Sequence, residues 1–148
     1  MSPEQRMVLE FHEKYNLPRP ARPSMPSHKD RLRRARLIFT EAAEFIEAAD
    51  QSDFIEMVDA LADILVVTYG TAVEMGVDLE PVFAEVQRSN MSKNGGLDAG
   101  GKVRKGSAFS PPDIAGALRR QGYSPDLAPA GGAVGGVADA PASKSVPS

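Results

Sequence analysis

Residues 37–87 are the feature that most limits how this chain of 148 residues can fold. The stretch contains twelve acidic residues and no lysine or arginine, so it cannot neutralise its own charge. Many of these acids recur every three or four residues, which is the spacing of one face of a helix. An almost wholly apolar run over residues 64–73 follows the second group of acids. We therefore predict helices in which carboxylates lie beside buried apolar surface.

The rest of the chain also carries helical patterns, and no alternation typical of strands occurs. Capping residues precede apolar repeats at several positions, and Ser2 with Gln5 forms a predicted capping box at the first of them. The second and third helices, joined by a tight turn, should form an antiparallel hairpin. The fold class is therefore all-α, with helices expected over residues 3–16, 28–49, 54–75, 79–91 and 114–120.

Composition sets further bounds on the class of protein. The chain has no cysteine, which excludes disulfides and thiolate metal sites, and its net charge of −3 gives no reason to expect a nucleic-acid partner. The N-terminus lacks a secretion signal pattern and the longest apolar run is too short to span a bilayer, so we expect a cytoplasmic protein without membrane contact. Residues 1–121 are predicted to form one domain, and the Ala/Gly/Pro/Ser-rich residues 122–148 a disordered tail.

The acids are not equivalent on their helices. Glu41 falls inside the apolar arc of its helix, Glu44 at its margin and Glu47 opposite its centre. Residues three or four apart are neighbours on a helix, so pairs of acids can offer oxygens to a common point. Hard cations such as Mg²⁺ and Mn²⁺ take oxygen ligands, and a cation would offset the repulsion within such a cluster. The predicted metal-binding set comprises Glu41, Glu44, Glu47, Asp59 and Asp63.

Simpler interpretations exist for each of these groups. Acids at helical spacing are usually a solvated helix face, and the basic run over residues 29–36 is by default solvated as well. His12 and His28 lie outside the acidic stretch and are expected at the surface rather than as ligands. Glu74 is grouped with the caps and solvated acids. Glu41 inside an apolar arc, and Asp63 at the head of an apolar run, favour the metal site.

The same residues carry a family resemblance. Glu41-Ala-Ala-Glu44, followed by Asp59-Ala-Leu-Ala-Asp63, resembles the all-α nucleoside triphosphate pyrophosphohydrolases of the MazG-like superfamily. The Arg-Ser-Asn-Met-Ser-Lys segment over residues 88–93, with Gly101-Lys102-Val-Arg-Lys105 and the segment 111–114, is similar to the phosphoribosyl-ATP pyrophosphohydrolase-like subgroup, which includes dUTPase-like members. The resemblance spans roughly residues 39–114.

The resemblance implies Mg²⁺-dependent cleavage between the α- and β-phosphates of a nucleotide such as dUTP or a non-standard triphosphate, with Mn²⁺ as a substitute. The products would be a monophosphate and pyrophosphate, and the role would be control of the nucleotide pool. It also implies that hairpins from two chains pack into four-helix bundles, as a dimer or tetramer. The implied catalytic residues are Glu41, Glu44 and Asp63. The implied substrate-binding residues are Asn90, Lys93, Lys102 and Lys105, with Arg88 as a weaker candidate.

One position departs from the family pattern. The glutamate of the family's E-x-x-D pair would fall at position 60, which is Ala60, and Asp59 could substitute for it from a neighbouring direction. The departure leaves open a helical oligomer that binds nucleotides or proteins without turnover. Phosphoribosyl-ATP hydrolysis is a second alternative, although the long loop after residue 91 favours the nucleotide-pool subgroup.

Overall fold

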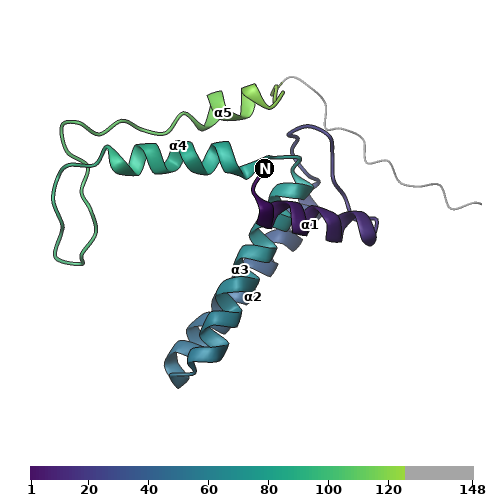
Figure 1. Cartoon of the computed structure of the whole chain (residues 1–148), viewed down its shortest axis with the longest axis horizontal. Helices are drawn as coiled ribbons and strands as arrows, with labels where there is room; N and C mark the ends of the chain where they lie inside the picture. Colours follow the sequence, from purple (N-terminus) through teal and green to yellow (C-terminus); the bar gives the residue numbers. More distant parts are fainter. Residues whose placement is uncertain (126–148) are drawn as a thin grey trace, which may run out of the picture.

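A computed structural model describes residues 1–125, which contain five α-helices and no β-strand (Figure 1). The all-α prediction is therefore confirmed, and the predicted ends agree with the observed ones to within two residues. Between the last two helices the only extended pairing in this part of the chain is a single bridge, Leu97 to Val103. Most of the predicted tail, residues 126–148, lies outside the described residues. The helices are α1 (Pro3–Lys14), α2 (His28–Gln51), α3 (Phe54–Glu74), α4 (Leu79–Met91) and α5 (Ile114–Arg120).

Helices α2 and α3 form the predicted antiparallel hairpin. Ser52 ends α2 in the left-handed conformation, and the Asp53 carboxylate accepts the backbone N–H groups of Ile55 and Glu56 at 3.1 Å to start α3. Ala48 and Ala60 are buried in this hairpin. Small side chains at these positions let the two helices approach closely.

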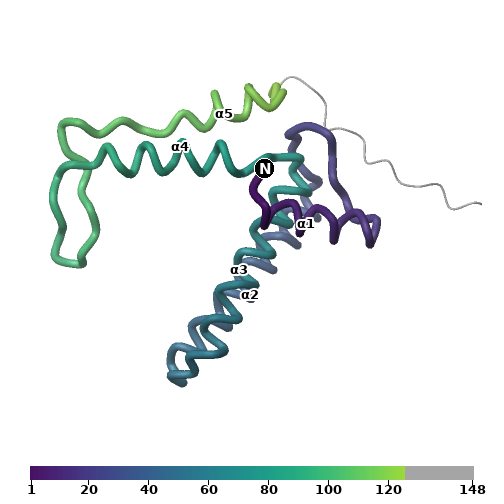
Figure 2. The backbone as a smooth tube through the Cα atoms, viewed as in Figure 1, coloured from purple at the N-terminus to yellow at the C-terminus, as the bar shows by residue number. Residues whose placement is uncertain are grey.

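Helices α4 and α5 pack against each other and form an arm, residues 79–120, that leaves the hairpin at a sharp bend (Figures 1 and 2). The axes of α3 and α4 differ by 115°. Gly76 makes the bend, with a φ of +67° that favours glycine. A Cβ atom there would lie 2.3 Å from the carbonyl oxygen of Arg22, so no other residue fits without moving the linker.

Two glutamines hold the bend in place. Gln5 of α1 is fully buried, donates to the carbonyl of Val77 at 2.7 Å and accepts the N–H of Leu79 at 3.0 Å. Gln121 bonds both the N–H and the carbonyl of Asp78, at 2.8 and 2.9 Å. The predicted capping box is therefore half wrong. Ser2 caps α1, but the Gln5 side chain is used on the α3–α4 turn.

The core of the single chain is small and lies where α1 crosses the end of α3. Ala72 and Val73 are buried there, whereas Leu65 and Val66 are 54% and 50% exposed. Within one chain, α2 thus leaves part of the apolar second half of α3 uncovered. No single helix of residues 1–125 is long and apolar enough to cross a membrane, and only α3 and α4 together, across their bend, meet that test.

Candidate active site

Three acids of the hairpin form what we call the acid face: Glu41, Glu44 and Asp63. Glu41 is partly buried on α2, Glu44 is exposed on the same helix, and Asp63 is exposed on α3. Partial burial raises the pKa of the Glu41 carboxyl, and the negative charges of Glu44 and Asp63 raise that pKa further. The charges of Glu44 and Asp63 therefore reach the Glu41 carboxyl across the hairpin.

Glu47 and Asp59 complete the predicted metal-binding set but stand apart from the acid face. Both side chains are exposed, and Glu47 accepts a hydrogen bond from the Gln51 side chain at 3.2 Å. Neither is among the charges that raise the pKa of Glu41. Ala60, where the family motif carries glutamate, is 5% exposed and is covered within the hairpin. Of the other four predicted ligands, only Glu44 and Asp63 thus raise the pKa of Glu41.

The acid face has the type of ligand that a hard cation prefers, but its side chains are not arranged around a common point in one chain. All three side chains offer carboxylate oxygens, which Mg²⁺ and Mn²⁺ prefer, and no basic side chain is paired with them in the described residues. However, no group of three or more His, Asp or Glu side chains in residues 1–125 is arranged to hold a metal ion. One chain therefore supplies the ligand type without forming a closed site.

The predicted phosphate-binding residues lie on the arm, around what we call the basic loop, residues 92–110. Lys102 and Lys105 are exposed on this loop, and the Lys105 ammonium lies 4.6 Å from the centre of the Phe109 ring. Lys93 donates to the Asn90 side chain at 2.7 Å. Figure 1 shows the loop at the far end of the arm, away from the hairpin. Within one chain, the structure does not bring these residues to the acid face.

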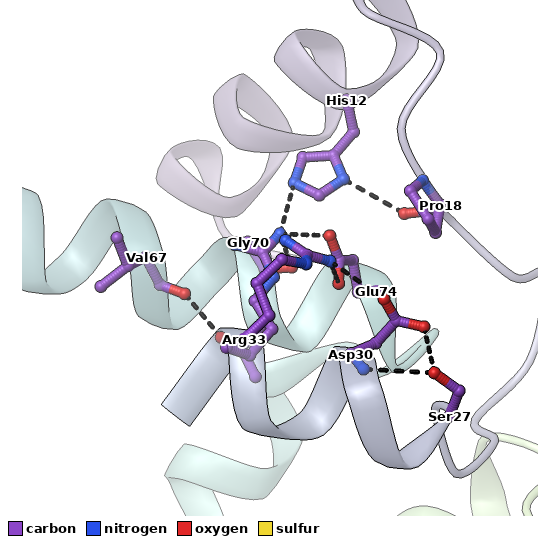
Figure 3. Close-up of polar contacts among 10 residues, drawn as sticks. His12, Pro18, Ser27, Asp30, Arg33, Val67, Gly70 and Glu74 are labelled. Atoms are coloured by element: carbon purple, nitrogen blue, oxygen red, sulfur yellow. Dashed lines mark hydrogen bonds and ion pairs between the residues drawn. The ribbon is translucent and has the colours of Figure 1, made fainter. Parts of the chain in front are cut away.

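A second group of charges lies at the end of the hairpin near the bend and was missed by the sequence analysis (Figure 3). Glu74 of α3 is buried and accepts from Arg33 at 2.6 Å and from Arg34 at 2.7 Å, both on α2. Arg33 also lies 3.6 Å from Asp30. These residues, with His12, form what we call the ion cluster. The expectations that Glu74 and the basic run are solvated are therefore wrong for Glu74 and Arg34.

His12 belongs to the same cluster and corrects a second expectation. Its side chain is buried rather than at the surface. Nδ1 lies 3.1 Å from the carbonyl of Pro18, which can only accept, so Nε2 is left to accept from Arg34 at 3.2 Å. Burial lowers the pKa of His12, so the neutral ring is favoured. Gly70 makes room for this contact, because a Cβ there would lie 3.1 Å from Arg34. Two features of the sequence could have indicated this cluster: Gly70 within α3, and the acid Glu74 at the end of an apolar run.

A family model for phosphoribosyl-ATP pyrophosphohydrolase matches residues 8–90, which include α2, α3, the acid face and nearly all of α4. The chain belongs to the phosphoribosyl-ATP pyrophosphohydrolase family. The predicted membership of the MazG-like superfamily is thereby confirmed, and the family indicates a pyrophosphohydrolase. Members of this family are generally dependent on divalent metals. A search of curated proteins found no match.

Proposed function

We propose that this pyrophosphohydrolase cleaves the α–β phosphate bond of a nucleoside triphosphate, such as dUTP or a non-standard nucleotide, and depends on Mg²⁺. The observation that supports the proposal is the acid face, in which the partly buried Glu41 feels the charges of Glu44 and Asp63 and none of the three has a basic partner in the described residues. Carboxylates without a positive partner repel one another, which destabilises the fold, and a divalent cation would offset this repulsion. Family membership supplies the reaction class.

In this proposal the acid face holds Mg²⁺, with Glu47 and Asp59 as outer acids of the same surface. Bound Mg²⁺ would polarise the phosphoryl oxygens and lower the pKa of a coordinated water. The positive side chains of Lys93, Lys102 and Lys105, with the amide of Asn90, would bind the phosphates and orient the chain of phosphate groups. No histidine or hydroxyl nucleophile is needed.

We further propose that the working unit contains two or four chains. The hairpin leaves a broad apolar surface uncovered, including Phe39 and Phe54, which are 74% and 76% exposed. Apolar patches of this extent mark protein–protein contacts. A second chain could also bring its basic loop to the acid face, which the loop of the same chain does not approach. Light scattering coupled to gel filtration should report a dimer or tetramer, and a monomer would contradict this part of the proposal.

Two classes of substrate, which differ in their base and sugar, fit the proposed reaction. The family description favours phosphoribosyl-ATP as a second candidate, and the basic loop motivates the free-nucleotide substrates. Both share a triphosphate that is cut at the same bond, so the acid face serves either. They differ in the nucleoside that is attached to the α-phosphate.

A panel of triphosphates tests the proposal. The panel contains dUTP, the standard and non-standard nucleotides and phosphoribosyl-ATP, each with Mg²⁺ and with chelator. We expect pyrophosphate, not orthophosphate, and a monophosphate product from at least one substrate, with Asp63→Asn as the inactive control. Orthophosphate release would contradict the bond assignment. No product from any substrate would favour a nucleotide- or protein-binding oligomer without turnover, which Ala60 would then explain.

A further inference from the structure

Arg88, in the last turn of α4, is bonded to the two parts of the arm that meet at the base of the basic loop. Its Nε and Nη2 atoms donate to the two carboxylate oxygens of Glu85 at 3.0 and 2.8 Å. Its Nη1 atom donates to the Ser110 hydroxyl at 3.1 Å, and Nη2 also donates to the carbonyl of Pro111 at 2.9 Å. One guanidinium thus ties α4 to the chain that returns from the loop.

Glu85 makes the connection stronger. The same carboxylate accepts the backbone N–H of Asp113 at 2.8 Å, next to the start of α5. The Arg88 guanidinium lowers the pKa of Glu85 to about 2, with help from the Asp113 N–H, so this carboxylate is charged at neutral pH. Paired, two-pronged bonds between a guanidinium and a carboxylate fix direction as well as distance. We call this pair, with its bonds to residues 110–113, the loop clamp.

The basic loop has few other means of holding its direction. Ser92 accepts the N–H of Ser110 at 2.8 Å and closes the base of the loop. Beyond that base, the hydrogen bonds of residues 94–109 join only those residues to one another, as where Asp98 accepts the N–H groups of Gly100 and Lys102. Figure 2 shows the loop extending freely from the end of the arm. The direction of the whole loop therefore depends on its base.

We propose that Arg88 is a positioning residue, which with Glu85 sets the direction in which the basic loop presents Lys102 and Lys105. Its guanidinium is occupied by the clamp and does not itself bind phosphate. The expected effect on kinetics rests on the proposed function. The expected effect on the loop rests on the loop clamp alone. It replaces the weaker expectation that Arg88 contacts the substrate.

Limited trypsin digestion tests the structural part in the full chain. Cleavage after Lys102, Arg104 and Lys105 is followed by mass spectrometry in Arg88→Ala, Arg88→Lys and Glu85→Gln, with Arg6→Ala as the matched loss of an exposed arginine on α1. We expect cleavage at the loop to be about tenfold faster in the three clamp variants, because loss of a charge-assisted pair opens the loop more often. Arg6→Ala should match the wild type. Equal loop cleavage in Arg88→Ala and wild type overturns the proposal.

Steady-state kinetics on the active triphosphate then separate positioning from direct binding. We expect Arg88→Ala and Glu85→Gln to raise KM by about tenfold with little change in kcat, since each breaks the same pair. Arg88→Lys should not rescue KM, because an ammonium keeps the charge but cannot form the two-pronged bond. If Arg88 bound phosphate directly, Glu85→Gln would free its guanidinium and leave KM unchanged or lower, which would overturn the proposal. A wild type without turnover defeats the proposed function, and the digestion still decides the clamp.

Discussion

The middle of the α2–α3 hairpin and its end near the bend differ in how acidic side chains are paired. At the end near the bend, Glu74 is buried and is met by two arginines at 2.6 and 2.7 Å. In the middle of the hairpin, Glu41 is partly buried, and burial together with the like charges of Glu44 and Asp63 raises its pKa. Glu74 therefore has positive partners within the chain, whereas Glu41 has none in the described residues. The comparison indicates that Glu74 serves the fold, and it is the reason why we propose a cation-binding role for the acid face.

The largest expected effect is on stability at the ion cluster. Glu74→Gln should lower the free energy of unfolding by about 3 kcal/mol or more, because it leaves two arginines facing a neutral amide in a buried place. Urea unfolding followed by circular dichroism measures this change. Glu10→Gln, an exposed acid on α1, is the matched control and should change stability by less than about 0.5 kcal/mol. Equal stability of the two variants would show that the cluster does not hold the fold.

Substitutions in the acid face should lower activity rather than stability. Asp63→Asn and Glu41→Gln should reduce pyrophosphate release by about 100-fold or more, as expected for loss of a metal ligand. Neither should unfold the chain, and Glu41→Gln should raise the melting temperature slightly in chelator, because it removes like-charge repulsion. The raised pKa of Glu41 gives the same sign: its favourable contribution is present below its ordinary pKa and is lost as pH rises through the folded pKa. Full activity with lowered stability would make these acids structural.

Ala60 offers an intermediate effect that sharpens the comparison. Ala60→Glu should cost about 1–3 kcal/mol in chelator, since a larger charged side chain enters a covered position in the hairpin. Added Mn²⁺ should then raise the melting temperature more in this variant than in the wild type, because the new carboxylate can join the acid face. Thermal unfolding with and without Mn²⁺ measures both. A Mn²⁺ shift no larger than that of the wild type would place position 60 outside the site.

The smallest effect expected is the pH dependence of the ion cluster. The pKa of His12 is lowered in the folded chain, so its contribution to stability is present above its ordinary pKa of 6.5 and is lost as pH falls through the folded value. Protonation would also place a second cation beside Arg34. We expect the melting temperature to fall between pH 7.5 and 5.5 in the wild type and to fall less in His12→Gln. Parallel pH profiles would exclude His12 as the titrating group.

The sequence predicted the helices well because their ends carry local signals. Asp53 and Asp78 bond the first N–H groups of the helices that follow them, and Gly76 stops α3, all within a few residues. Helical spacing also placed Glu41 on the apolar side of its helix, where it is partly buried, with Glu44 one turn away. These inferences need only neighbours three or four positions away.

The remaining features join residues that are far apart in the chain, and no local pattern encodes them. Gln5 bonds the α3–α4 turn more than 70 residues away, and Arg34 bonds Glu74 at a separation of 40. The clamp between Arg88 and residues 110–111 likewise depends on how the basic loop returns. The apolar pattern of α3 likewise shows that the helix needs cover, but not which chain supplies it.

The central claim is that the unpaired acids of the hairpin, unlike the paired one, hold a divalent cation. Anomalous diffraction from crystals soaked in Mn²⁺ tests it most directly. We predict a peak within coordination distance of the carboxylates of Glu41, Glu44 and Asp63, on the order of 2.2 Å from the oxygens, and its loss in Asp63→Asn. Diffraction without a peak at these carboxylates, at a Mn²⁺ concentration that supports turnover, would contradict the account.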